Sequence, residues 1–593
     1  AEAKAVWKIR ESGPRAASAV PGSLPRFEGW DDASVAPERL GPYLRDVRKL
    51  LNEFKYQAAF YGHFGDGCIH MQVSFDFESE DGIRRYAEFV DRAADLVIRY
   101  GGSLSGEHGD GQSRGALLPK MFGDDVMRAF AEFKAVWDPR NRMNPHKVID
   151  AYQPTENLRQ GADYSPAQPA TFFSFPDDHG SFAKAAERCI GLGECRKHDY
   201  GTMCPSYMVT LEERHSTRGR ARLLWELLQG EVLKGSWKSE EVKESLDLCL
   251  SCKACKSECP TNVDIATYRA EFLSHYYETR RRPLAAYAFG LIDTWAALGA
   301  NTPRLANLLL KAPGVTPLVK QVLGLAPQRA MPQLAPKSFT RWARSAHVPA
   351  PGQGGTGAKP EVILWADTFN NYFHPTTSRA ALRVLQAAGR HVTVPAARMC
   401  CGRPLYDFGM LDRAKRYLQQ VMDHLGPQID AGVPIVVLEP SCASVFRDEL
   451  RGLFPPGGRA ERLRKQTFLL SEYLERYAPE FRPRLDRSVL LHGHCHHKAL
   501  MKMTDEEAIL RKMGATVTSP DAGCCGMAGP FGFDADKYDL SIAIGERVLL
   551  PAVRNTAPDA LIVSDGFSCR EQIRQATGRR PLHLAEAIQI AME

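Results

Sequence analysis

The stretch "CLSCKACKSECP", from Cys249 to Pro260, decides how this chain of 593 residues is interpreted. Its cysteines follow the spacing C-x2-C-x2-C-x3-C-P, in which thiolates bind a [4Fe-4S] cluster. Where two such clusters occur together, the fourth cysteine of a run serves the other cluster. The first three cysteines therefore need another ligand, and a further cysteine that precedes a proline is the candidate. The sequence predicts one complete cluster on Cys249, Cys252, Cys255 and Cys204.

A partner run lies upstream, but it is incomplete. Five residues separate Cys189 from Cys195, and Leu192 stands where the middle cysteine would fall. With Cys259 added, three thiolates are available for a second cluster. They could hold a three-iron cluster, a labile cluster, or a four-iron cluster with a further ligand such as His198. We favour the four-iron cluster because the helical framework around it is otherwise complete.

The last third of the chain contains an internal repeat in which each copy carries a CCG triplet. Cys400 lies 124 positions before Cys524, and Cys442 lies 127 positions before Cys569. Such a nearly constant offset indicates two homologous units. Each unit opens on a short apolar run typical of a buried parallel strand. We predict a duplicated α/β domain over residues 361–593, with halves of about 361–485 and 486–593.

The cysteines of this repeat predict metal binding. Neighbouring cysteines do not easily form a disulfide with each other, whereas both thiolates can bind metal ions of one cluster. The second copy offers Cys495, Cys524, Cys525 and Cys569. The first copy offers Cys400, Cys401 and Cys442, with Thr368 at the position that matches Cys495. The type and number of iron–sulfur or other metal centres stay open, as does the role of the histidines beside Cys495, His494, His496 and His497. They could complete a site or form a solvent-exposed cluster.

The first 150 residues predict an α+β domain with a metal site. Asp66-Gly67 lies between two β-rich segments and is a strong hairpin signal. If these two residues form the turn, His63 lies opposite His70, and two imidazoles so placed can chelate one metal ion. Glu107 and His108 lie on a glycine-rich turn and could complete the site. The alternative is two surface histidines and an unrelated turn carboxylate.

Three motifs of this domain carry a family resemblance. "YGHFGDGCIH", "SGEHGDG" and "WDPRNRMNPHK" resemble the C-terminal substrate domain of flavin-linked 2-hydroxy-acid dehydrogenases of the vanillyl-alcohol-oxidase type. The resemblance implies FAD as cofactor. It also implies that His63, His70 and Glu107 hold a divalent metal such as Zn, which polarises the substrate hydroxyl. His108 would then remove the hydroxyl proton.

The same resemblance assigns two further residues and leaves the substrate open. It implies that Arg10 pairs with the substrate carboxylate and that Asn144 lies near the flavin. The sequence departs from the family pattern at Cys68, at Gln72 and at Trp30. Members of the family hold FAD mainly in an N-terminal domain with glycine-rich loops, and these 593 residues contain no such loops. We therefore expect the FAD-binding part to be missing or to lie on another chain.

The repeat region also resembles a known family. It is similar to the CCG domains of heterodisulfide reductases and of the iron–sulfur subunit of glycolate oxidase, although neither copy ends in their C-x-x-C. In chain order, the domains resemble fused bacterial D-2-hydroxyglutarate dehydrogenases with flavin and iron–sulfur centres. The resemblance implies oxidation of a D-2-hydroxy acid. The best candidate reaction is the oxidation of D-2-hydroxyglutarate to 2-oxoglutarate. D-lactate or glycolate oxidation, a non-catalytic electron-transfer subunit, and disulfide reduction at the CCG cysteines are the alternatives.

Composition and linkers complete the prediction of a multidomain α/β protein. Non-periodic joins at 151–180 and 348–360 separate the α+β domain from a helical dicluster domain at 181–347 and from the CCG domain. A net charge of +6 argues against nucleic acid, and no apolar run is long enough to span a membrane. We expect a cytoplasmic protein, or one bound peripherally at the inner face of the membrane. It would pass electrons to a quinone, a cytochrome or a flavoprotein. Whether it forms a homo-oligomer stays open.

The amphipathic segment 304–327 is predicted to belong to the core rather than to form a membrane anchor.

Overall fold

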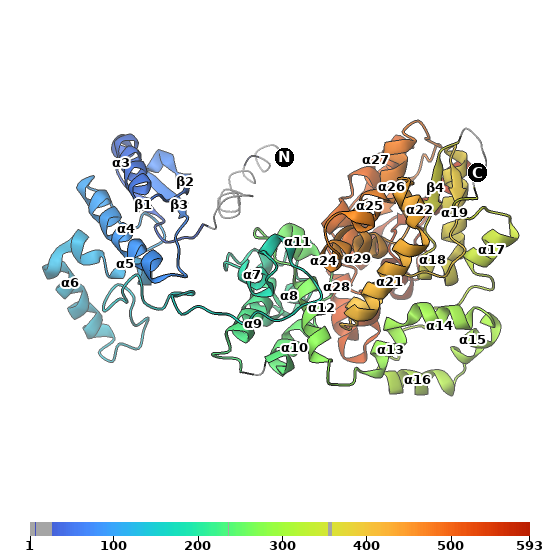
Figure 1. The fold of residues 1–593 in the computed structure, drawn as a ribbon, viewed down its shortest axis with the longest axis horizontal. Helices are drawn as coiled ribbons and strands as arrows, with labels where there is room; N and C mark the ends of the chain where they lie inside the picture. The colour runs from blue at the N-terminus through green and yellow to red at the C-terminus, as the bar shows by residue number, and fades with distance from the viewer. Residues whose placement is uncertain (1–5, 7–25, 235, 354–358) are drawn as a thin grey trace. The chain divides into compact units, whose positions relative to one another are not determined.

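The computed structural model describes residue 6 and residues 26–234, 236–353 and 359–593. Figure 1 shows the helices and strands, which form two compact units, Ala1–Ser165 and Pro166–Glu593. The first unit holds an antiparallel sheet with helices, and the second holds parallel sheets and many short helices. The predicted fold class, a mixed multidomain protein, is confirmed.

The first unit is built on a small antiparallel sheet of order β1-β3-β2. Its strands are β1 Ala33–Ser34, β2 Ala58–His63 and β3 Cys68–Val73, and its helices are α3 Leu40–Glu53, α4 Glu80–Arg99, α5 Gly111–Gly115 and α6 Leu118–Trp137. Along β3 the side chains alternate between the two faces of the sheet. Ile69, Met71 and Val73 enter the apolar core. Cys68 and His70 are thereby placed on the other face.

The predicted register of the hairpin is wrong. Residues Phe64–Asp66 form a 3-10 turn, and Gly67 follows at φ +73°, so four residues and not two connect the strands. His63 consequently lies opposite Cys68, and Tyr61 lies opposite His70. The period of two keeps His63 and His70 on the same face as diagonal neighbours, which long side chains can bridge. Their rings lie 5.7 Å apart between centroids.

The second unit begins with a helical domain around the ferredoxin-type cysteines. Its helices are α7 Phe182–Glu187, α8 Pro205–Thr210, α9 Thr217–Gln229, α10 Glu240–Asp247, α11 Ala254–Glu258 and α12 Ile265–Tyr276. Most are short, and the loops between them carry most of the cysteines. Cys204 stands immediately before α8 with φ +58°, and Cys259 ends α11.

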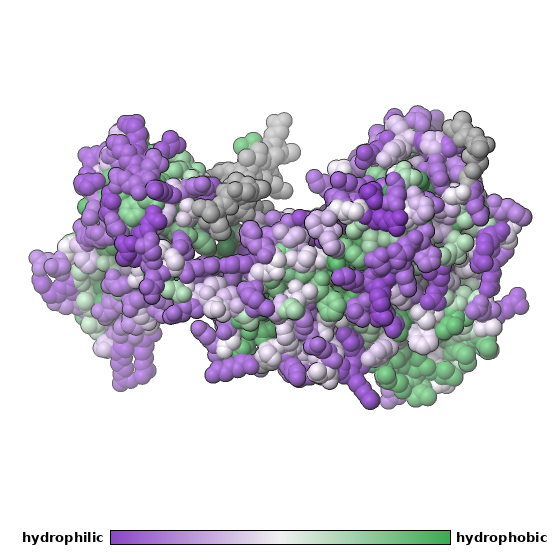
Figure 2. Space-filling model, viewed as in Figure 1, coloured by the Kyte–Doolittle hydropathy of each residue, from purple (hydrophilic) through white to green (hydrophobic). Residues whose placement is uncertain are grey.

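An arm of short helices follows, with α13 Leu284–Gly290, α14 Ile292–Gly299, α15 Pro303–Leu309 and α16 Val315–Leu323. The prediction that residues 304–327 belong to the core is wrong, because no residue of α15 or α16 is buried. Leu308 is 65% exposed and Leu318 is 60% exposed. The apolar side chains of this arm face outward, where Figure 2 shows a hydrophobic area over α13–α16.

The duplicated domain folds as two parallel sheets that follow α17 Phe339–Ser345. The first has order β5-β4-β6-β7, and the second has order β10-β8-β9. In each half the first strand, β4 or β8, pairs with the two strands that follow it. A fourth strand is present in the first half as β7, and in the second half it shrinks to a single parallel bridge between Val563 and Leu582. The two halves therefore share one strand arrangement, as the repeat predicts.

The elements of the first half are β4 Glu361–Leu364, α18 Thr368–Tyr372, α19 Pro375–Ala387, β5 His391–Thr393, α20 Arg403–Tyr406, α21 Leu411–His424, α22 Gly426–Asp430, β6 Ile435–Val437, α23 Pro440–Ser444, α24 Leu450–Leu453, α25 Gly458–Gln466, β7 Thr467–Leu469 and α26 Leu470–Tyr477. Those of the second half are β8 Ser488–Leu491, α27 Thr504–Lys512, β9 Thr516–Thr518, α28 Tyr538–Glu546, α29 Leu549–Asn555, β10 Leu561–Val563, α30 Phe567–Thr577 and α31 Leu584–Met592. A one-turn π-helix follows Ser444 and another follows His496.

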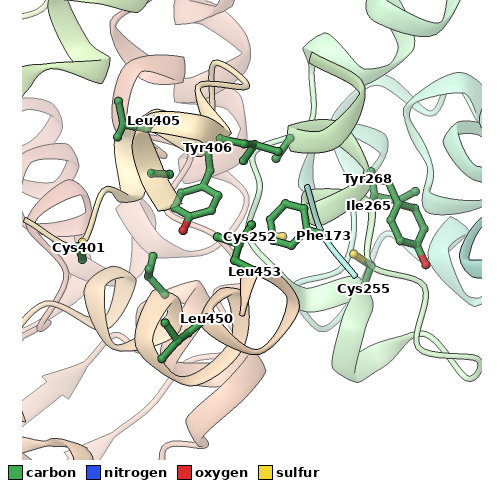
Figure 3. Close-up of a cluster of buried hydrophobic side chains, with 14 of the residues drawn as sticks. Phe173, Cys252, Cys255, Ile265, Tyr268, Cys401, Leu405, Tyr406, Leu450 and Leu453 are labelled. Carbon is green, nitrogen blue, oxygen red and sulfur yellow. The ribbon is translucent and has the colours of Figure 1, made fainter. Parts of the chain in front are cut away.

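One apolar core joins the helical domain to the first half of the duplicated domain. Figure 3 shows Cys252, Phe173 and Tyr268 in the same buried cluster as Cys401 and Tyr406. Two domains that share a continuous core are expected to unfold together rather than to move as separate bodies.

A buried lysine crosses this interface. Lys253 lies between two cluster cysteines and is 1% exposed. Its Nζ lies 3.0 Å from Asp264 Oδ2, 2.9 Å from Asp448 Oδ2 and 3.4 Å from Glu449 Oε1. Burial by itself would lower the pKa of Lys253, but these three carboxylates outweigh it and raise the pKa above its usual value. Asp448 and Glu449 belong to the duplicated domain, so the cluster loop is anchored across the interface.

We expect Lys253→Met to destabilise the second unit strongly. Removing one partner of a buried ion pair leaves the other charge uncompensated, at a cost of about 3–5 kcal/mol. The free energy of unfolding, from urea denaturation of the intact protein, measures this cost. Lys238→Met is the matched control because Lys238 is an exposed lysine of the same domain. Equal unfolding free energies for the two variants would contradict the proposed anchoring.

Candidate functional site

The predicted metal ligands of the first unit converge on one oxygen atom. Glu107 Oε1 lies 2.9 Å from His63 Nε2 and 3.1 Å from His70 Nε2. The ring of His108 stacks on that of His70, with 4.8 Å between centroids and 9° between planes. His70 is buried, whereas the side chain of His108 is 52% exposed. The arrangement places a buried imidazole beneath an accessible one.

Asp32 holds the loop that carries Glu107 and His108, and the sequence reasoning missed it. Its carboxylate accepts hydrogen bonds from the backbone N–H groups of Glu107, at 3.0 Å, and His108, at 2.8 Å. The thiol of Cys68 donates to it at 3.0 Å, and Ser105 Oγ also donates. Burial would raise the pKa of Asp32, but these hydrogen bonds outweigh burial and hold the pKa well below its usual range. Asp32 therefore fixes the loop as a charged acceptor.

The neighbouring Asp31 faces the two stacked histidines. Its carboxylate oxygens lie 3.4 Å from His70 Nδ1 and 3.8 Å from His108 Nδ1. Burial raises the pKa of Asp31. The only sequence signal for either aspartate is the pair itself, in "WDDAS" just before β1, which looks like an ordinary turn.

These donors fit a divalent metal ion. Two groups have ligand atoms within 4.8 Å of one another, one of Asp32, Cys68, His70 and Glu107, and one of Asp31, His70 and His108. Imidazole and carboxylate ligands are typical of zinc sites. His70 belongs to both groups, and His63 reaches the site through Glu107.

Two residues predicted for this site stand apart from these contacts. Asn144 is exposed and lies in a turn after α6, with φ +46°. Arg10 lies outside the described residues. Their assigned roles stay predictions.

The candidate site for the first iron–sulfur cluster is a group of four neighbouring thiols, three of which are buried. Burial, then Asp264, Cys204 and Cys249, raises the pKa of Cys255. Burial, then Cys495, Cys255 and Cys249, raises the pKa of Cys252. The four cysteines predicted for one cluster are thus neighbours. They fit a [4Fe-4S] cluster, because its iron ions would bind these crowded sulfurs as thiolates.

The second dicluster site also brings its predicted cysteines together. Burial raises the pKa of Cys195, and Cys259 raises it further. Cys195 Sγ accepts a hydrogen bond from the backbone N–H of Arg218 at 3.2 Å. Among the causes that raise the pKa of Arg218 are both Cys195 and Cys189. Three thiols therefore surround this site, and whether a further ligand completes it stays open.

In the second half of the duplicated domain, four buried cysteines form a connected set. The side chain of Cys524 contacts that of Cys495 and lowers the pKa of Cys495, and the side chains of Cys524 and Cys569 lower the pKa of Cys525. In the first half, Cys401 Sγ lies 2.8 Å from Cys442 Sγ. Cys400 Sγ accepts a hydrogen bond from Thr368 Oγ1 at 3.6 Å. The second set fits a metal cluster, and the first is the same set with a hydroxyl in place of one thiol.

The histidines beside Cys495 are buried. His494 is 6% exposed, His496 4% and His497 1%, so the alternative of a solvent-exposed cluster is wrong. His496 Nε2 donates to the backbone oxygen of Ser251 at 2.8 Å, and Ser251 precedes Cys252. This bond and the influence of Cys495 on Cys252 place the second-half cysteines beside the first cluster loop.

Comparisons with known families agree with this division of the chain. A family model for FAD linked oxidases, C-terminal domain, matches residues 1–148, and one for a 4Fe-4S dicluster domain matches residues 185–263. A model for a cysteine-rich CCG domain matches residues 367–447 and 489–574. The chain therefore joins a C-terminal domain of FAD-linked oxidases, a 4Fe-4S dicluster domain and a duplicated CCG domain. These families imply FAD and [4Fe-4S] clusters, as the sequence predicts.

The chain is homologous to D-2-hydroxyglutarate dehydrogenases. That of Pseudomonas putida is 28% identical over 94% of this chain, and that of Escherichia coli is 27% identical over 94%. The chain spans 58% of the length of each of these relatives. A subunit of the anaerobic glycerol-3-phosphate dehydrogenase of Escherichia coli is 27% identical over 53% of this chain and 79% of its own length.

In the part of the chain that the structure describes, every helix is too short or too polar to cross a membrane.

We expect Thr368→Cys to complete the cysteine set of the first half. The new thiol would stand beside Cys400, where the second half has Cys495 beside Cys524. If the second half holds a cluster, iron and acid-labile sulfide per chain should rise above the wild-type values. Thr377→Cys, at a buried threonine of the next helix, is the matched control. A folded Thr368→Cys variant with unchanged iron would show that the halves differ in more than one ligand.

Proposed function

We propose that this chain is part of a flavin- and iron–sulfur-dependent dehydrogenase that oxidises a D-2-hydroxy acid, with D-2-hydroxyglutarate as the best candidate. The convergence of His63, His70 and Glu107 beside an accessible His108 carries this proposal. The homology to D-2-hydroxyglutarate dehydrogenases supports the same substrate class. The product would be 2-oxoglutarate.

The residues of the site divide the work between metal binding and proton transfer. His63, His70 and Glu107 would hold a divalent metal ion, which as a Lewis acid lowers the pKa of a bound hydroxyl group. His108 is exposed and would accept the proton from the C2 hydroxyl. Asp31 lies near Nδ1 of His108 and would orient its ring. Arg10 would pair with the substrate carboxylate, for which a guanidinium is suited.

The flavin would be held mainly by another part of the protein. Helix α6 supports this inference because it exposes Phe133, Val136 and Trp137 at 68%, 76% and 70%. Large exposed apolar groups on one helix indicate a surface that another body covers. The matched relatives are longer than this chain, so they have further sequence that could supply such a body. Asn144, in the turn after α6, would then lie near the flavin.

The cysteine sites would carry the electrons away from the flavin. The [4Fe-4S] clusters supply one-electron transfer when bound. The cysteines of the first cluster lie beside Cys495 of the duplicated domain, which extends the chain of redox sites.

Two alternatives keep the same architecture. The substrate could be D-lactate or glycolate, because Cys68, Gln72 and Trp30 depart from the family pattern. The chain could also act only in electron transfer for a separate flavoprotein, which its similarity to a subunit of glycerol-3-phosphate dehydrogenase supports. The His63, Glu107 and His70 contacts favour catalysis over the second alternative.

We expect His108→Ala to stop reduction by substrate and leave the clusters intact. Loss of a general base lowers the rate about 10²–10⁴-fold. Anaerobic titration of the flavin-containing protein with D-2-hydroxyglutarate, D-lactate and glycolate should bleach the wild-type flavin with the true substrate only. Dithionite should bleach the clusters of both proteins.

The exposed His424 provides the control, since His424→Ala should behave as the wild type. Full substrate reduction in His108→Ala would remove this residue from the mechanism. If none of the three acids bleaches the wild-type flavin while dithionite reduces the clusters, the electron-transfer alternative is correct.

We expect Cys204→Ser and Cys259→Ser to damage different clusters. The first variant should weaken the cluster on Cys249, Cys252 and Cys255, and the second should weaken the cluster on Cys189 and Cys195. Iron analysis and electron paramagnetic resonance of the dithionite-reduced proteins should show a different signal lost in each. Cys68→Ser should lose neither. Loss of the same signal in the Cys204 and Cys259 variants would overturn the assignment.

A further inference from the structure

A cavity of about 260 Å³ lies in the second unit beside Cys495. Its walls are largely apolar and include aromatic side chains, with Phe289 and Trp295 from the arm, Phe369 from the first half and Phe567 from the second. A cavity of about 150 Å³ is enough to bind benzene. This cavity therefore has room for a substituted six-membered ring. Packed interiors rarely keep voids of this size, which indicates a ligand site.

Polar groups gather where the cavity meets the redox cysteines. His494, Cys495 and His496 all line it. His496 is nine-tenths buried, its Nε2 donates to the oxygen of Ser251, and its Nδ1 has no hydrogen-bond partner within the described chain. With Nε2 as the donor, Nδ1 of the neutral ring is an acceptor. His496, a residue of the cavity lining, therefore keeps an acceptor atom without a partner in the described chain.

The arm α13–α16 gives the cavity an apolar surround. Phe289 and Trp295 line the cavity and belong to the arm, and Trp295 is also 51% exposed. The arm exposes further large apolar side chains, namely Leu284, Tyr287, Leu298, Leu305, Leu308, Leu309, Val315, Leu318, Val319 and Val322. Figure 2 shows a hydrophobic area over the arm. Trp295 thus belongs both to the exposed apolar surface of the arm and to the cavity wall.

The charge of this region identifies what the arm contacts. Residues 294–360 contain eight lysines and arginines and no aspartate or glutamate, although the whole chain has 70 acidic residues. The arm itself contains one acidic residue, Asp293, which is only 5% exposed. An apolar helical surface whose exposed charges are basic fits an anionic lipid surface.

We propose that the cavity binds the ring of a membrane quinone, which enters from an anionic bilayer on which α13–α16 rest. The ring would stack among the aromatic walls, and an oxygen of the reduced ring would donate to His496 Nδ1. The inference rests on the proposed function only for the source of the electrons. Oxidation of a 2-hydroxy acid to the 2-oxo acid releases two electrons and two protons, and reduction of a quinone to a quinol takes up two of each.

The cavity is tested with two acceptors. Ubiquinone-1 should need the cavity, whereas ferricyanide, a small anion, can take electrons at any exposed redox site. We expect Ala296→Phe, which fills the cavity, and Trp295→Ala, at its half-exposed wall, to lower D-2-hydroxyglutarate:ubiquinone-1 turnover at least 10-fold. Ferricyanide turnover should stay within about twofold. Equal effects on both acceptors, or none, would overturn the site.

A measurement of electron transfer without substrate separates this inference from the proposed function. Protein reduced by dithionite and freed of excess reductant should reduce ubiquinone-1 in the wild type and fail to do so in Ala296→Phe, whatever the natural substrate. If D-2-hydroxyglutarate bleaches no flavin but this difference holds, the proposed function fails and the quinone site stands. If the substrate works and the difference is absent, the quinone site fails.

The lipid contact is tested on exposed positions, where substitutions do not disturb the core. Leu308→Glu combined with Leu318→Glu should abolish sedimentation with phosphatidylcholine vesicles that contain phosphatidylglycerol. Val232→Glu is the matched control, because Val232 is 72% exposed outside the arm. Wild-type protein that ignores these vesicles, and instead forms a dimer that the double variant dissociates, would overturn the bilayer assignment in favour of a second copy of the chain.

Discussion

Crowding of buried thiols is the constraint on which the second unit depends. Cys495 of the duplicated domain lies close enough to the cluster loop to raise the pKa of the buried Cys252, and Cys249 raises the pKa values of both Cys252 and Cys255. Separate thiolates would repel one another there, and iron removes that repulsion by sharing the charge. The domains must therefore be held in register around the sulfurs, and Lys253 does so across the interface. Arg403 strengthens the same join through Glu449, with Nη1 2.9 Å from Oε1.

The sequence predicted which residues lie together better than it predicted the register of the strands that carry them. Spacing alone grouped the cysteines of each site, because ligands in one short loop have few ways to be arranged. That His63 and His70 share one face of the sheet followed from the period of two, which survives a change of register by two residues. The register itself did not follow, because a 3-10 turn closed by Gly67 is as compatible with "FGDG" as a two-residue turn. Asp32 was missed because its partners are more than 30 residues away in sequence.

The arm shows where periodicity fails. Segment 304–327 has the apolar spacing of a buried helix, and spacing cannot say whether protein or lipid covers that face. Two other features of the same sequence bear on whether protein or lipid covers this face. Its helices are short, because Pro303 begins α15 and Gly314 and Gly324 flank α16, and its charges are of one sign only. A core helix of a globular protein is normally flanked by both signs of charge. The lack of aspartate and glutamate in this segment was therefore a stronger signal for an exposed face than the apolar spacing was for a buried one.

The two halves of the duplicated domain contribute different groups around the cavity and the cluster loop. Both halves kept the strand order and the CCG turn, but only the second kept four cysteines. Thr368 occupies the matching position in the first half, and that half instead supplies Arg403, Asp448 and Glu449 to the interface with the cluster loop. The first copy thus supplies charged groups to the interface, while the second supplies four buried cysteines, beside which His494 and His496 line the cavity.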